Sequence, residues 1–317
     1  MQTSRTAKPI RNRTSAEPAG PRQIVLSASR RTDIPGGYTP WFMAGIETGR
    51  FDVINPFNRS TRRVGVSPEM VHTIVFWSKN YGPFLDLKAH ARLAEMGFNL
   101  FFNFTVNTPD PLLEPGIPGL DRRLAQAAEL AGYFDPAQIA WRFDPICLYR
   151  QNGNLRNNLG EFEKIADTLS NLGIKRCITS FYDPYKKVEQ RIRRMVRSGD
   201  PMVELIPPSF ADRQKIIRRM ADGLAARSMT LSLCCEKDLA AVPDIGATPS
   251  ACIDGRLYRD LFGGNPDTSA DAGQRRKQGC RCTRSVDIGS YDTHPCFHNC
   301  LFCYARTGLD TIKGKDT

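Results

Sequence analysis

Short apolar runs alternate with amphipathic helical patterns along most of this 317-residue chain, and that alternation limits the folds open to it. Apolar residues fill both alternating positions of the runs, which is typical of parallel strands buried on both faces. Repeated strand–helix alternation predicts an α/β fold with a parallel sheet, open or closed into a barrel. The predicted strands span 23–29, 51–57, 72–78, 99–107, 138–144, 175–183 and 229–236, with 202–207 a weaker candidate. The predicted helices span 39–48, 85–96, 120–131, 159–172, 185–198 and 212–227.

Polar side chains stand where the predicted strands end. Because the carboxyl ends of parallel strands share one rim, and such proteins bind ligands there, we expect a binding site at these residues. The alternative for each Asp-Pro or Asn-Pro pair is a simple turn. The rim residues are Arg30, Arg31, Asp33, Asn55, Lys79, Asn107, Arg142, Asp144 and Glu236.

Three cysteines near the end of the chain, Cys296, Cys300 and Cys303, have the spacing C-x-x-x-C-x-x-C. Iron–sulfur cubanes are usually held by four cysteines, so a three-thiolate loop leaves one iron open to a substrate or cofactor. The alternative is zinc, which also accepts closely spaced cysteines and which His294 or His298 would help to bind.

Further cysteines converge from three other segments. Cys235, Cys252, Cys280 and Cys282 form a soft ligand set that suits a second iron–sulfur cluster or, alternatively, structural zinc. Cys147 and Cys177 lie inside apolar strand-like runs and are expected to be inert buried thiols.

The three-cysteine loop, with the aromatic Phe302 inside it, resembles that of radical S-adenosylmethionine (SAM) enzymes, which normally carry it near the N-terminus. The segments SASRRTDIP, NPFN, VFWSKN, WRFDPI, CIDG, SVDIGSYDT and CFHNCLFCYA resemble an uncharacterised bacterial family, domain of unknown function eighteen-forty-eight, over about residues 23–306. That family is noted for a C-terminal cysteine cluster of this kind. Phe302 and Asn299 replace its usual tyrosine and glycine, and Pro295 is inserted, but no thiolate is lost.

The resemblance implies a radical SAM-like (β/α) barrel, partial or full, with the cluster loop permuted to the C-terminus. Residues 1–22 would form a flexible basic tail, 23–262 the α/β barrel-like domain and 263–317 a cysteine-rich segment packed on it. The implied function is a 4Fe–4S enzyme that cleaves SAM reductively to methionine and a 5′-deoxyadenosyl radical. Its reductant would be a flavodoxin or ferredoxin, and its substrate a small molecule or a nucleic acid.

The Gly-Gly-Glu motif that ordinary radical SAM enzymes use to bind SAM is absent. Basic side chains such as Arg30, Arg31, Lys79 or Arg142 are expected to pair with the methionine carboxylate instead. Arg142, Asp144, Arg30 and Asp33 are the catalytic candidates. The candidates for binding SAM or substrate are Arg31, Asn55, Lys79, Asn107 and Glu236.

The net charge is +11, and the predicted helix at 185–198 carries much of it. A basic stripe is typical of a solvated helix face or of a nucleic-acid-binding surface. The alternative function is therefore a non-enzymatic iron–sulfur or zinc protein that binds nucleic acid. No apolar stretch approaches the roughly 18 residues of a membrane span. Cysteines used as ligands, together with the lack of a secretory signal pattern, indicate a reducing cytoplasm.

Overall fold

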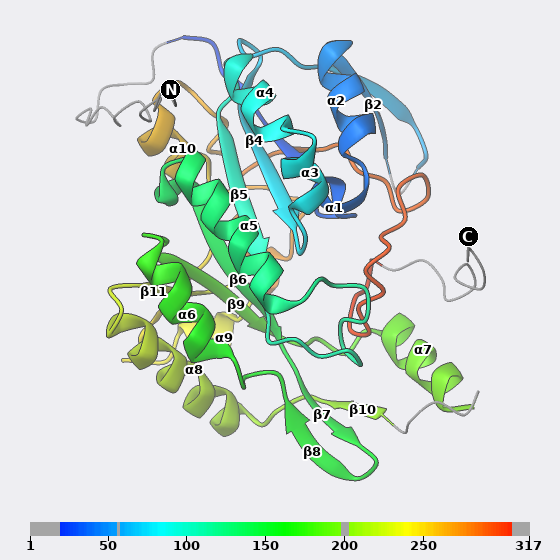
Figure 1. Cartoon of the computed structure of the whole chain (residues 1–317), viewed down its shortest axis with the longest axis vertical. Helices are drawn as coiled ribbons and strands as arrows, with labels where there is room; N and C mark the ends of the chain where they lie inside the picture. The colour runs from blue at the N-terminus through cyan, green and yellow to red at the C-terminus, as the bar shows by residue number, and fades with distance from the viewer. Residues whose placement is uncertain (1–19, 56–57, 198–202, 306–317) are drawn as a thin grey trace.

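An eight-stranded parallel sheet runs through this computed structural model, which describes residues 20–55, 58–197 and 203–305 (Figure 1). The strand order is β12-β11-β9-β6-β5-β4-β1-β13, so it follows the chain from β1 to β12, while β13 pairs in parallel with the free side of β1. The strands are β1 (Ile24–Ala28), β4 (Val71–Ser78), β5 (Leu100–Thr105), β6 (Ile139–Ile146), β9 (Arg176–Phe181), β11 (Thr230–Leu233), β12 (Ala247–Pro249) and β13 (Val286–Asp287). The α/β class and the parallel sheet expected from the sequence are confirmed.

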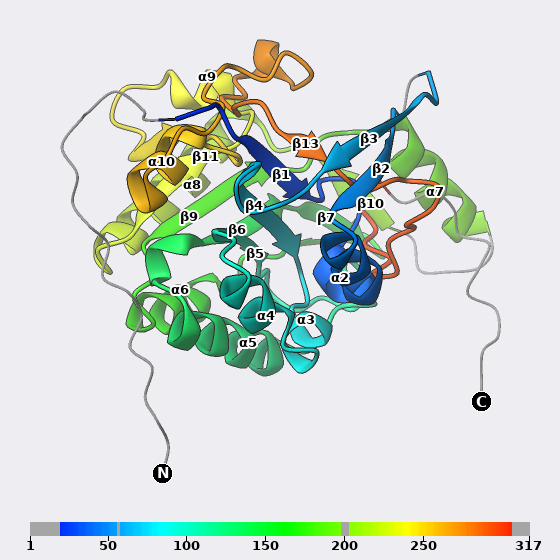
Figure 2. The ribbon, with the colours of Figure 1, turned by 90° about the horizontal axis from the view of Figure 1, so that it is seen from above.

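Sequential order of parallel strands is the arrangement of a barrel, because same-handed crossovers place successive helices on one side of the sheet. No pairing joins β12 to β13 among the described residues, so the sheet is barrel-like but open at that seam. Figure 2 shows the curved sheet with helices ranged along its outer side.

Helices follow most of the sheet strands, and several of them contribute to one large apolar cluster on the outer face. None of the helices in the described part of the chain is long and apolar enough to cross a membrane. The helices are α1 (Ile34–Gly37), α2 (Thr39–Glu47), α3 (Gly82–Asp86), α4 (Ala89–Glu95), α5 (Leu120–Tyr133), α6 (Phe162–Asn171), α7 (Lys186–Arg197), α8 (Phe210–Ala225), α9 (Lys237–Ala240) and α10 (Gly255–Phe262), with 3-10 turns at Pro136–Gln138 and Arg276–Gln278.

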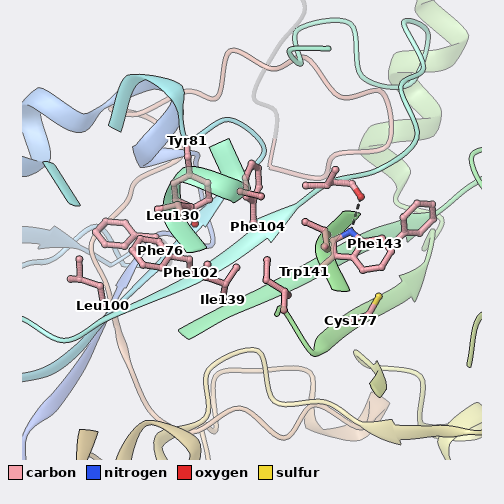
Figure 3. Packing of buried hydrophobic residues seen from close by; sticks show 14 of the residues in the cluster. Phe76, Tyr81, Leu100, Phe102, Phe104, Leu130, Ile139, Trp141, Phe143 and Cys177 are labelled. Carbon is pink, nitrogen blue, oxygen red and sulfur yellow. Dashed lines mark hydrogen bonds between the residues drawn. The ribbon is translucent and has the colours of Figure 1, made fainter. Parts of the chain in front are cut away.

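Aromatic side chains fill the space between the sheet and these outer helices (Figure 3). Phe76 and Phe102 stack with ring centroids 5.8 Å apart. Trp141 satisfies its one polar atom by donating from Nε1 to the carbonyl oxygen of Val106 at 2.9 Å. Cys177 points into the same core, and burial raises its pKa, in keeping with the inert thiol expected from the sequence.

The inner face of the sheet carries a second apolar cluster, because side chains alternate between the two faces along each strand. Val25, Val75 and Phe101 point to this side, and Tyr258 of α10 packs against Phe101 with ring centroids 5.0 Å apart. Cys252 and Cys282 belong to the same cluster. The cysteine-rich segment therefore supplies both an edge strand and part of the inner core.

Two predicted strands lie outside the parallel sheet. The run at 51–57 forms β2 (Arg50–Ile54), which pairs in antiparallel fashion with β3 (Thr61–Gly65); residues 56–57 lie outside the described chain. The weaker run at 202–207 forms β10 (Val203–Ile206) in an antiparallel sheet with β7 (Leu148–Gln151) and β8 (Asn154–Asn157). The proposed basic tail, 1–22, falls mostly outside the described residues.

The helix predicted at 85–96 is also different in the structure, where it divides into α3 and α4. Lys88, between the two, has φ of +51°, a left-handed conformation that cannot continue a right-handed helix. The prediction failed because the apolar periodicity runs on across the break.

Candidate metal and cofactor site

A cavity of about 320 Å³ lies at the carboxyl ends of the parallel strands. Strand-end residues of β1, β4, β6, β9 and β11 line it together with the C-terminal segment. Six of the nine rim candidates are among the lining residues: Arg30, Arg31, Asp33, Lys79, Arg142 and Asp144. Both cysteine sets line it as well, so the two groups of thiols face the same cavity.

The three-cysteine loop is held against the body of the protein through its backbone. The amide of Leu301 donates to the Leu113 carbonyl at 2.8 Å, and the amide of Gly116 donates to the His298 carbonyl at 3.0 Å. Asn299, between the first two cysteines, adopts φ of +56°, a left-handed conformation that is rare for residues other than glycine. Cys300 is 5% exposed, whereas Cys296 and Cys303 are half-buried.

Arg191 of α7 holds the same loop from the other side. Its guanidinium donates to the carbonyl oxygen of Leu301 at 2.7 Å, of Cys303 at 3.0 Å and of Cys300 at 3.4 Å. Carbonyls of an irregular loop need such partners when they are buried. This role could not be predicted from the sequence, because Arg191 is one of several cations on a basic helix.

The second set contains five thiols rather than four. Cys234 Sγ lies 3.3 Å from Cys252 Sγ and 3.9 Å from Cys235 Sγ. Cys282 contacts both Cys252 and Cys280, and Cys280 contacts Cys235. The three segments expected to converge therefore do so, and Cys234 joins them.

No three His, Cys, Asp or Glu side chains in the described residues surround one point closely enough to hold a single metal ion. A zinc ion needs such convergence, with ligand atoms about 2.0–2.3 Å away. In a cubane cluster each thiolate binds a different iron, so the sulfur atoms do not have to surround one point. The two histidines named as possible zinc ligands have other contacts. His298 Nε2 lies 2.6 Å from Asp33 Oδ2, and the ring centroids of His294 and Trp41 are 4.1 Å apart. In type and number, the thiols suit a cluster at the three-cysteine loop.

The cavity also holds polar groups that have no hydrogen-bond partner in the described part of the chain. Nε of Arg30, Nε1 of Trp77 and Oγ1 of Thr32 are buried and unpaired, and all three residues line the cavity. Buried donors without partners are costly, so each of these atoms needs a partner from water, from a ligand or from a rearranged side chain. The centroid of the Trp77 ring lies 6.0 Å from Cζ of Arg30 and 5.2 Å from Cζ of Arg142.

Arg142 is the most enclosed of the rim cations. It is 6% exposed, and it binds Asp144 Oδ2 at 2.5 Å and Cys252 Sγ at 2.8 Å. Burial lowers the pKa of Arg142, but the Cys252 thiolate and the Asp144 carboxylate outweigh burial and hold it well above the ordinary value. Arg142 therefore stays charged and compensates negative charge on the second thiol set.

Asp33 and Lys79 also have protein partners already. Asp33 accepts from Ser78 and from the Lys79 amide, each at 2.9 Å, besides its contact with His298. Lys79 Nζ binds Glu114 Oε1 at 2.5 Å and lies 5.4 Å from the centroid of the Phe302 ring. Burial lowers the pKa of Lys79, yet Glu114 and Cys300 outweigh burial and raise it. The sequence reasoning missed Glu114, which lies in an irregular segment with no strand end to mark it.

Burial raises the pKa of Cys296 to about 12 and holds the pKa of Cys300 well above its ordinary value. Metal ligands must be thiolates, so ligation by this loop must release protons and is favoured by higher pH.

The other three rim candidates do not line the cavity. Asn107 forms hydrogen bonds with two residues near the cavity: it accepts from the Asp144 amide at 2.8 Å and donates to Glu114 Oε1 at 3.1 Å. Glu236 accepts from the Phe181 amide at 2.8 Å and from Arg213 at 3.2 Å. Asn55 follows β2 of the side hairpin, and its amide donates to the Ser60 carbonyl at 2.9 Å.

Fold and cavity together define an α/β protein with a thiol-lined cavity at the carboxyl ends of a parallel sheet. The chain belongs to the family described as Domain of unknown function (DUF1848), whose model matches residues 25–305. No curated protein and no solved structure matches the chain.

Proposed function

We propose that this protein is a radical SAM-type iron–sulfur enzyme whose cluster loop comes from the C-terminal end of the chain. The observation that carries the proposal is that Cys296, Cys300 and Cys303 line one cavity with unpaired donors and strand-end cations. Three thiolates leave one iron of a cubane open, and the cavity beside the loop has room for a ligand of that iron.

The position of the loop in the sheet also supports the proposal. The loop follows β13, a parallel strand beside β1, so β13 acts as the first strand of the sheet although it comes last in the sequence. In radical SAM enzymes, which this loop resembles, the three cysteines follow the first barrel strand. A circular permutation of that arrangement accounts for a cluster loop at the C-terminus.

In this proposal the three thiolates of the loop would hold a 4Fe–4S cluster, and the chemistry supplied by such a cluster would be one-electron cleavage of a sulfonium carbon–sulfur bond of SAM. Arg30 and Arg31, which line the cavity, would pair with the carboxylate of SAM. Lys79 lies over the ring of Phe302 and Arg191 donates to the Leu301 carbonyl, so both cations contact the loop. Arg142 keeps positive charge in the cavity. An external donor of the flavodoxin or ferredoxin class would deliver the electron.

The test is product formation by anaerobically purified protein given SAM and dithionite. We expect 5′-deoxyadenosine and methionine in equal amounts from the unmodified protein and none from Cys300→Ala. Cys177→Ala, which removes a thiol from the outer core, should keep the activity. If the unmodified protein binds iron and sulfide but forms no 5′-deoxyadenosine, the proposed function is wrong.

A further inference from the structure

Cys234 and Cys235 are adjacent in the chain, yet both thiols line the cavity. Successive residues of a strand normally point to opposite faces of the sheet. Cys235 adopts φ of +61°, in the left-handed region that non-glycine residues rarely occupy. The chain therefore turns directly after β11, and this turn brings the second thiol to the same side. Backbone strain of this kind tends to occur at functional sites.

The two adjacent thiols differ in their surroundings. Cys252 and Cys282, each 5% exposed, belong to the inner core cluster, and Cys234 and Cys280 pack against that cluster. Among the described residues Cys235 is not part of it. Cys235 contacts Cys234 and Cys280 and also feels the charge of Arg275, whose guanidinium forms an ion pair with Asp183 among the residues that line the cavity.

We propose that Cys234, Cys252, Cys280 and Cys282 bind the second metal centre, and that Cys235 keeps a free thiol beside it. The contact of 3.3 Å between Cys234 and Cys252 joins β11 to the segment that precedes α10. Arg142 lies 2.8 Å from Cys252 Sγ, and Arg30 interacts electrostatically with Cys282, so positive charge is in place for a set of buried thiolates.

Soft thiolates suit an iron–sulfur cluster, in which each thiolate binds a different iron, so the four sulfur atoms do not have to surround one point. The assignment of ligands depends on the proposed function in one respect only, because both treat these thiols as metal ligands.

The matched pair Cys234→Ser and Cys235→Ser tests the assignment. Metal and acid-labile sulfide are measured per chain after anaerobic purification. If both sites hold four-iron clusters, Cys234→Ser should lose about half of the iron and sulfide, while Cys235→Ser should keep both. Iron that remains at the three-cysteine loop shows that the variant has folded. The opposite pattern, or equal losses in the two variants, would overturn the assignment.

Alkylation of the unmodified protein provides a second test that does not depend on the folding of a variant. The anaerobic, metal-loaded protein is treated with iodoacetamide, and modified cysteines are located by peptide mass. Cys235 should react, whereas Cys234 should react only after a chelator has removed the metal. Protection of Cys235 together with reaction of Cys234 would refute the proposal. A protein with this labelling pattern that does not cleave SAM would refute the proposed function alone.

Discussion

Gly116 sets how closely the three-cysteine loop approaches the rest of the protein. A Cβ atom at this position would lie 2.7 Å from the carbonyl oxygen of His298 and 2.9 Å from its Cα, and backbone atoms cannot give way cheaply. We expect Gly116→Ala to lower the free energy of unfolding by about 1–3 kcal/mol, as overpacking usually does. It should also speed the loss of iron from the loop.

Urea unfolding and the rate of iron release to a chelator would measure both effects. Gly132→Ala is the control, because a Cβ at that position meets nothing within 4 Å. Equal stability of the two variants would show that the close approach of the loop is unimportant.

His72 makes the stability of the protein depend on pH. Its Nε2 lies 2.6 Å from the Gly263 carbonyl and its Nδ1 2.8 Å from Thr73 Oγ1, so a neutral ring donates to the first and accepts from the second. Burial lowers the pKa of His72, although the Gly263 carbonyl opposes it. The unfolded chain, with a His pKa of about 6.5, therefore binds more protons at lower pH, and stability falls as the pH drops below that value.

The fall due to His72 should not exceed about 1.4 kcal/mol per pH unit. Urea unfolding at pH 7.5 and pH 5.5 measures it, with His72→Gln as the comparison. The variant keeps an amide donor for Gly263 but does not titrate, so it should lose less stability on acidification. An identical loss in both proteins would assign the pH dependence to other groups.

The sequence predicted the polar strand ends but not the side chains with which they pair. The polar ends of β1, β4 and β6 could be recognised because each follows an apolar run, but their partners come from distant segments. Asp33 pairs with His298, and Arg142 pairs with Cys252. Those pairings depend on the tertiary fold, so side chains that the sequence offered as free to bind a ligand already have protein partners.

At the scale of elements, α7 has two faces with different roles. Val188 and Arg191 are buried on the side of the cluster loop, while Arg193 and Arg197 are exposed. One cation of the predicted basic stripe, Arg191, therefore has a structural role.

Replacing Arg191 by Met should leave buried carbonyls of the cluster loop without a donor, at a cost of about 1–3 kcal/mol. We expect faster release of iron to a chelator and a lower melting temperature. Arg193→Met, which breaks only an exposed pair with Glu189, should change neither by much. If Arg191→Met retained iron as well as Arg193→Met does, α7 would not hold the loop.

The differences between the predicted and the observed strands have physical reasons. β13 is two residues long, too short for any periodicity to be visible. β2 has the composition of a sheet strand but pairs with its neighbour β3, and only tertiary packing decides between those partners. By contrast β4, β5 and β6 are long and apolar, and the sequence predicted them correctly.

At the scale of the whole molecule, two cysteine-bearing segments, one directly before α10 and one before β13, help to close the inner face of the sheet. Cys252 and Cys282 pack there with Val25, Val75 and Tyr258. Metal bound to these thiols would therefore contribute to folding stability, because binding and folding are then coupled.

Protein purified without oxygen should contain about eight irons and eight sulfides per chain, if both thiol sets hold four-iron clusters. Chelation should then lower the melting temperature. Iron and sulfide assays with a thermal melt provide the measurement. Stoichiometric zinc with negligible sulfide would contradict the account of both sites.

The central claim is that the three-cysteine loop presents an open iron to SAM in the cavity. The EPR spectrum of the reduced, anaerobic protein, recorded before and after SAM is added, tests it most directly. The account predicts that SAM changes the spectrum of the unmodified protein and leaves that of Cys300→Ala unchanged. A spectrum that SAM does not alter, in a protein whose loop holds iron and sulfide, would contradict it.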